Sequence, residues 1–141
     1  MKKLTNLFTY GSLMFAPVWG RVVKGTYASS EEELEGFARY QVLGEEYPAV
    51  LRSTDVLSTS APPSSLLTGR VYWNIDEQDQ ARLDAFDGSD YERIKVTTRS
   101  QKQVDLYLYR HPQRLSQTAW DPVWFERQGM TEFLKRYPGF D

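Results

Sequence analysis

Short apolar runs, several of them alternating with polar residues, recur along the chain and predict a protein built mainly of strands. The predicted strands cover residues 4–9, 34–42, 47–51, 67–75, 91–98 and 104–110. The first strand ends abruptly at Tyr10-Gly11-Ser12, which indicates entry into a tight turn. Residues 99–102 separate the last two strands as a hairpin turn would, and Pro48 indicates either a sheet edge or an irregular start of its strand. The acidic residues 26–34 fit either an exposed strand or a loop.

Helical signals are fewer and depend mainly on capping residues. The predicted helices cover residues 15–23, 77–86 and 122–136. Asp76 is the expected N-cap of the second helix and Gly88 its stop. Asp121 is the expected N-cap of the third, with Pro122 at its first helical position. The Ser- and Pro-rich residues 58–65 are predicted to form a loop rather than a linker between domains.

The number and order of these elements predict an α+β fold, in which a small curled sheet or barrel is favoured over a wound βαβ sheet. The 141 residues suffice for one domain, so residues 1–141 are expected to form a single one. Aromatic residues reach 14%, which is ample for a core, and some of these rings are expected to line a cavity.

Charge and composition limit the classes of partner. A net charge of −2 provides no basic surface for nucleic acid or for an anionic membrane. Neither a signal peptide nor a membrane span is indicated, because no long apolar stretch is present. The absence of cysteine excludes disulfides, a thiolate nucleophile and a cysteine metal site. This composition is compatible with the expected cytoplasmic location, and the sequence gives no indication of the oligomeric state.

His111 is the only histidine. It excludes a metal centre with several histidines, and a Ser-His-Asp triad would have to use this one residue. His111 follows a predicted strand and precedes a proline, so it is expected to be a solvent-exposed turn residue. The chemistry is therefore expected to depend on carboxylates, hydroxyls and backbone amides.

Three motifs, in their order along the chain, resemble those of the gamma-glutamylcyclotransferase-like superfamily. The first is a strand that runs into Tyr10-Gly11-Ser12-Leu13, called here the Tyr-Gly-Ser-Leu turn. The second is Tyr47-Pro48-Ala49-Val50. The third combines the strand at residues 69–76, the Asp87-Gly88 pair after a helix, and Tyr91-Glu92-Arg93. The ordered set carries the resemblance, which spans roughly residues 4–109.

The resemblance implies a small mixed-strand β-barrel flanked by a few helices, with a cavity at one end. It also implies a reaction in which the α-amine of a γ-glutamyl group attacks its own γ-carbonyl. The products are 5-oxoproline and the released amine or amino acid, and no metal or cofactor is implied. The implied partner is thus a small-molecule γ-glutamyl amine or peptide.

The resemblance also implies site residues. Backbone N–H groups of Tyr10, Gly11, Ser12 and Leu13 are expected to hold the α-carboxylate or the developing oxyanion. Tyr47 belongs to the second motif and is expected to bind substrate. Tyr109, on the polar face of its strand together with Tyr107, is expected either to bind substrate or to form a cross-strand aromatic pair.

The expected acid/base is Asp87, which departs from the family by replacing a glutamate. The aspartate is shorter by one methylene, on the order of 1.3 to 1.5 Å of reach. Asp90 and Glu92 are the second and third candidates, and Glu92 ranks last because an inward Tyr91 would direct it outward. The departure leaves a second reading open, in which the chain is a binding or regulatory domain that lacks efficient catalysis. A structural domain that binds partners through its aromatic surface ranks third.

Overall fold

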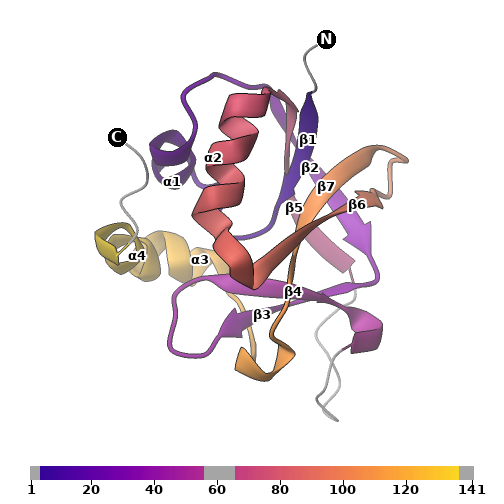
Figure 1. Ribbon diagram of the computed structural model, residues 1–141. Coiled ribbons are helices and arrows are strands. Elements are labelled where there is room, and N and C mark those ends of the chain that lie inside the picture. The colour runs from indigo at the N-terminus through magenta and orange to yellow at the C-terminus, as the bar shows by residue number, and fades with distance from the viewer. Residues whose placement is uncertain (1–3, 56–65, 137–141) are drawn as a thin grey trace.

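Strand β1 is the centre of the larger of two sheets in the computed structural model, which describes residues 4–55 and 66–136 (Figure 1). β1 pairs antiparallel with β5 and parallel with β7, which gives a five-stranded sheet of order β2-β5-β1-β7-β6. Its strands are β1 (Thr5–Thr9), β2 (Ser29–Glu35), β5 (Leu66–Ile75), β6 (Tyr91–Thr97) and β7 (Gln103–Tyr109). The acidic segment left open above is thus the edge strand β2.

A smaller sheet has the order β4-β3-β8, with both pairs antiparallel. Its strands are β3 (Phe37–Val42), β4 (Pro48–Arg52) and β8 (Leu115–Ala119). Pro48 begins the edge strand β4, as predicted, because an edge tolerates a residue without a backbone N–H. The sequence analysis missed β8, since its residues Leu-Ser-Gln-Thr-Ala lack an apolar alternation.

The α+β class is confirmed, but the sheets do not close into the expected barrel. The chain leaves the larger sheet at Gly36, whose φ of 84° is accessible mainly to glycine. The strand that follows pairs with β4 and β8 instead of continuing the larger sheet. Two packed open sheets are therefore the observed architecture.

The helices lie close to the ranges predicted from the sequence. They are α1 (Ala16–Val22), α2 (Glu77–Asp87), α3 (Pro122–Trp124) and α4 (Met130–Arg136). The Asp76 carboxylate accepts a hydrogen bond from the Asp79 backbone N–H, and Gly88 ends α2 with a φ of 76°. The predicted C-terminal helix is interrupted by a π-helical turn, Phe125–Gly129, between α3 and α4. None of the helices within residues 4–55 and 66–136 has the length and apolar composition needed to cross a membrane.

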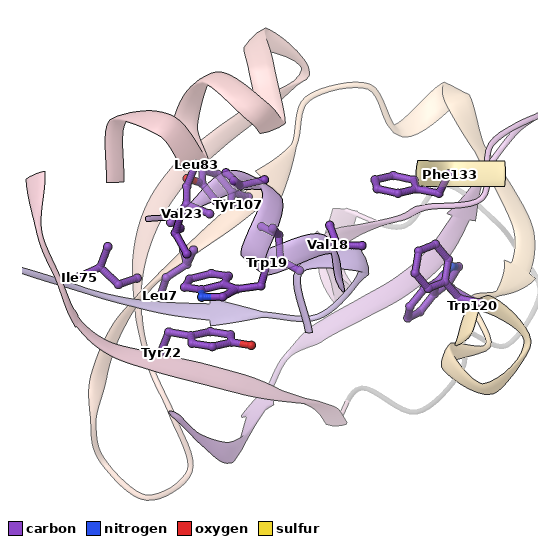
Figure 2. Close-up of a cluster of buried hydrophobic side chains, with 13 residues drawn as sticks. Leu7, Val18, Trp19, Val23, Tyr72, Ile75, Leu83, Tyr107, Trp120 and Phe133 are labelled. Atoms are coloured by element: carbon purple, nitrogen blue, oxygen red, sulfur yellow. The ribbon is translucent and has the colours of Figure 1, made fainter. Parts of the chain in front are cut away.

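The aromatic residues form much of the core, as composition suggested. Figure 2 shows the indole of Trp19 from α1 lying face to face with Tyr72 from β5, and their ring centroids are 3.6 Å apart. Phe125 of the π-helical turn is fully buried and packs against the rings of Trp120 and Phe133. These contacts fix α1 and the C-terminal helices against the sheets.

Asp79 ties α2 to the loop that follows α1. Its buried carboxylate accepts hydrogen bonds from the backbone N–H groups of Lys24 and Gly25, both at 2.9 Å. The Tyr27 hydroxyl donates to it at 2.6 Å, and Arg82 pairs with it at the same distance. Burial opposes the charge on Asp79, but these donors prevail and lower its pKa to about 2. This end of α2 is therefore held firmly in place.

Candidate active site

A cavity of about 180 Å³ lies where the end of β1, the end of α2 and the start of β4 meet. Half of its lining residues are aromatic, and two are carboxylic acids. The lining residues are Phe8, Thr9, Tyr10, Gly11, Ser12, Leu13, Tyr47, Pro48, Phe86, Asp87, Asp90, Tyr91, Tyr107 and Phe133. Pockets that enclose a drug-sized ligand measure roughly 300–1,000 Å³. This cavity is smaller, so it suits one small head group of a longer ligand.

The Tyr-Gly-Ser-Leu turn forms one wall of the cavity, and its anchors are buried. The Tyr10 hydroxyl donates to the Tyr107 backbone carbonyl at 2.6 Å, and Arg39 Nη1 donates to the Tyr10 carbonyl at 2.7 Å. Ser12–Met14 then form one 3₁₀ turn. The first N–H groups of such a turn have no partner within it, so Ser12 and Leu13 offer donors at the cavity wall.

Gly11 brings the first and second sequence motifs into contact. A Cβ atom at this position would lie 2.7 Å from Pro48 Cγ and 2.8 Å from Pro48 Cδ. Because a proline ring has little freedom to move, only glycine allows the turn to pack this closely against β4. The two motifs therefore form adjoining parts of the same cavity wall.

Gly11→Ala is expected to displace the turn from Pro48 and to lower ligand binding or turnover at least tenfold, since about 1 Å of misplacement is costly. Binding of the γ-glutamyl compounds expected from the sequence resemblance and the melting temperature measure the two effects. The matched variant Gly11→Ala/Pro48→Ala removes the clashing ring and is expected to recover part of the loss. Equal defects in the single and double variants would contradict the proposed contact.

Asp87 is the last residue of α2 and lines the cavity next to Phe86. Its carboxyl forms no hydrogen bond or ion pair within the described part of the chain. Burial, followed by the charge of Asp84, raises the pKa of Asp87 to about 8. Asp87 is therefore a carboxylic acid whose proton is exchangeable near neutral pH.

Three tyrosines surround this acid. Burial raises the pKa of Tyr10, Tyr91 and Tyr107, and the charge of Asp87 contributes to each increase. Their hydroxyls therefore remain protonated and act as hydrogen-bond donors. The Tyr91 hydroxyl donates to the Pro48 carbonyl at 3.2 Å. The cavity thus combines one exchangeable proton with fixed phenol groups.

The alternative acids are less favourably placed. Asp90 lines the cavity, but its Oδ1 atom is 2.9 Å from His111 Nε2 and 3.4 Å from Arg114 Nη1. Glu92 is exposed and is not among the lining residues. His111 is not the fully exposed turn residue expected from the sequence, because it pairs with Asp90 and packs edge-on against Tyr109.

The expected substrate-binding residues lie in the cavity with one exception. Tyr47 and the whole Tyr-Gly-Ser-Leu turn line it. Tyr109 does not belong to the lining, and its ring packs against Tyr91 at a centroid distance of 5.1 Å. From the same strand, Tyr107 lines the cavity instead, so of the two tyrosines named in the sequence analysis Tyr107 faces the site.

Some lining residues were not anticipated. Phe133 reaches the cavity from α4, at the far end of the chain, and no local pattern indicates this approach. Phe86 precedes Asp87 in α2, and the sequence analysis did not expect it at the cavity either. Within residues 4–55 and 66–136, no group of three or more His, Asp or Glu side chains is arranged to hold a metal ion.

Comparisons with known proteins bear on the family and the fold of the chain. Residues 7–124 match the model of a family described as "Gamma-glutamyl cyclotransferase, AIG2-like". Protein AIG2 C of Arabidopsis thaliana is 28% identical over 91 residues, which cover 64% of this chain and 50% of that protein. The chain spans about half the length of the curated relatives it matches.

Two solved structures illustrate the fold. The solution structure of an Arabidopsis thaliana protein has a TM-score of 0.66 at 22% identity, and the match covers 96% of this chain and 81% of that one. A yeast gamma-glutamyl cyclotransferase described as specific to glutathione has a TM-score of 0.52 at 13% identity. That match covers 74% of this chain and 68% of the yeast protein. At these identities the likeness establishes the fold alone.

Proposed function

Because the chain belongs to the gamma-glutamyl cyclotransferase, AIG2-like family, we propose that it forms 5-oxoproline from a γ-glutamyl amine or peptide, with Asp87 as the acid/base. The match to the family model confirms the family resemblance that the sequence motifs indicated. One observation carries the proposal. The Asp87 carboxyl, which has no hydrogen-bond or ion-pair partner among the described residues and a pKa of about 8, shares a small cavity with the Tyr-Gly-Ser-Leu turn.

The proton balance supports this assignment. A peptide α-amine has a pKa of about 7.7–8.0, and the free α-carboxylate of a γ-glutamyl group raises the pKa of its amine above that range. A pKa of about 8 brings Asp87 closer to this amine than an ordinary carboxyl group, which favours acid–base catalysis near neutral pH. Asp87 takes a proton from the attacking amine and returns it to the leaving nitrogen, while the N–C bond of the lactam forms and the original amide bond breaks.

The other residues of the cavity position the substrate and provide hydrogen-bond donors for it. In the proposed complex, the backbone N–H groups of Ser12 and Leu13 hold the α-carboxylate or the developing oxyanion. The aromatic lining excludes water and holds the γ-glutamyl group bent, so that amine and carbonyl approach each other within one molecule. Because the cavity is small, the leaving group extends out of it.

The rate is expected to rise with pH and then to level off. At low pH both Asp87, with a pKa of about 8, and the substrate amine hold protons that they must lose before attack. Once both are deprotonated, the proton that the amine loses on attack passes through Asp87 to the leaving nitrogen. Turnover measured from pH 5 to 10 should thus give a kcat/KM profile that rises between pH 6 and 8. A flat profile between pH 6 and 8 would contradict the role of Asp87.

The direct test is incubation of the protein with a panel of γ-glutamyl amines and peptides, with release of 5-oxoproline as the readout. Replacement of the family glutamate by the shorter Asp87 favours a second candidate, a small-molecule-binding domain without efficient turnover. If no compound releases 5-oxoproline but some raise the melting temperature, the second candidate is supported. Release from any member of the panel supports the enzyme.

A further inference from the structure

Two carboxyl groups of α2, those of Asp84 and Asp87, have contrasting surroundings. They lie three residues apart and therefore share one face of the helix. The Asp84 Oδ1 atom accepts hydrogen bonds from the Tyr107 hydroxyl at 2.6 Å and from Gln80 Nε2 at 3.0 Å. Arg93 Nε lies 3.3 Å from the same oxygen. The Asp87 carboxyl has no such donor within the described residues, so the donors and the cation gather around Asp84 alone.

The two carboxyl groups also face different openings. Asp87 lines the cavity described above, whereas Asp84 lines a second, polar depression of about 510 Å³ together with Arg93 and Asp105. Arg93 Nη1 continues the charge network with a 3.0 Å contact to Asp105, which also pairs with Lys95 at 3.3 Å. The charge of Asp84 is thus held behind the wall of the cavity, where substrate does not neutralise it.

We propose that Asp84 is a positioning residue that keeps the neighbouring Asp87 carboxyl protonated in the resting protein. An ionised Asp84 opposes a second negative charge on the same helix face, and it is the second cause, after burial, of the raised pKa of Asp87. Such pairs, with environments that separate their proton affinities, divide acid and base roles in known sites. The inference rests on the proposed function only in taking Asp87 as the group that exchanges protons with substrate.

Other groups face Asp87 from each neighbouring element. Those that line the cavity are Tyr10 after β1, Tyr47 before β4, Asp90 after α2, Tyr91 in β6 and Tyr107 in β7. Burial raises the pKa of Tyr10, Tyr91 and Tyr107, so these three phenols carry no charge near neutral pH. Asp90 is paired with His111 and Arg114. Asp84 is therefore the group whose charge bears most directly on Asp87.

Asp84→Asn is the sharpest test, because asparagine keeps an oxygen acceptor for Tyr107 and Gln80 while it removes the charge. The pKa of Asp87, measured in the whole protein by ¹³C NMR of its carboxyl carbon, is expected to fall by about one unit or more. Asp105→Asn is the matched control: it removes a carboxylate that contacts the same Arg93 but does not contact Tyr107 or lie on α2. The Asp105→Asn variant is not expected to lower the pKa of Asp87.

An unchanged Asp87 pKa in Asp84→Asn overturns the inference, and so does an equal fall in Asp105→Asn. If Asp84→Asn fails to fold, Arg93→Gln replaces it, with an expected rise in the Asp87 pKa because Asp84 then loses its cation. A fall or no change in that variant overturns the inference. If turnover is observed, its acid limb should move to lower pH in Asp84→Asn. If the NMR shift is observed without any turnover, the proposed function fails and the inference about Asp84 stands.

Discussion

Asp87→Asn is expected to lower 5-oxoproline release by about 10²–10⁴-fold, the usual contribution of a general acid–base group. The asparagine side chain fills the same space in the cavity wall but neither accepts the proton of the amine nor returns it. Folding should persist, because the Asp87 carboxyl has no hydrogen bond or ion pair to lose within the described residues. Initial rates at pH 8, with circular dichroism as a check on folding, measure both outcomes.

Matched variants separate this role from general effects of charge near the cavity. Asp87→Ala should abolish turnover, and Asp87→Glu, which restores the family's residue, should keep or raise it. Asp90→Asn tests the paired carboxylate that also lines the cavity, and Glu92→Gln changes an exposed one. Both are expected to retain activity within a fewfold of the parent protein. Full activity in Asp87→Ala would refute the assignment of Asp87 but not the fold.

Gly69→Ala is expected to destabilise the protein by about 3 kcal/mol or more, at the upper end of overpacking effects. A Cβ atom on Gly69 of β5 would lie 2.6 Å from the Phe8 ring, and it would also clash with the Thr9 carbonyl oxygen of β1. Phe8 is fully buried, and Thr9 belongs to the backbone of the central strand, so neither moves at small cost. The midpoint of urea unfolding measures the loss.

Gly20→Ala is the control for this effect. Gly20 lies within α1, and apart from its chain neighbours and the helix's own backbone no atom of the described residues comes within 4 Å of a Cβ built there. Alanine favours a helix over glycine by about 1 kcal/mol, so this variant should be neutral or more stable. A similar unfolding midpoint for Gly69→Ala and the parent protein would show that β1 and β5 are not packed as closely as described.

Local chemistry made most of the fold predictable. Caps such as Asp76 and Gly88 define helix ends through their own hydrogen bonds and dihedral angles, and they identified α2 to within one residue. Strand β8 was missed because its residues lack the alternation that one buried face imposes. Closure of the sheet was predicted wrongly, since the change of sheet at Gly36 depends on tertiary pairing that no local pattern records.

The sequence motifs predicted part of the cavity lining, and the other lining residues could not be predicted from the sequence. The Tyr-Gly-Ser-Leu turn, Tyr47 and Asp87 line one cavity, as the order of the motifs suggested. Alternation on β7 grouped Tyr107 with Tyr109 but did not show that only Tyr107 reaches the cavity. Asp84 was not recognised, because its importance arises from donors on three different elements that meet only in the folded chain.

The π-helical turn Phe125–Gly129 determines which side chain the C-terminal helix presents to the cavity. Each residue of an α-helix advances the chain by about 100° around the axis, and a π-helical turn accommodates one residue more than an α-helical turn. Phe133 follows this turn and lines the cavity. In a relative lacking that one residue, an uninterrupted α-helix would rotate the corresponding phenylalanine about 100° away from the cavity. A single-residue deletion would therefore remodel the pocket wall without altering any residue of the three sequence motifs.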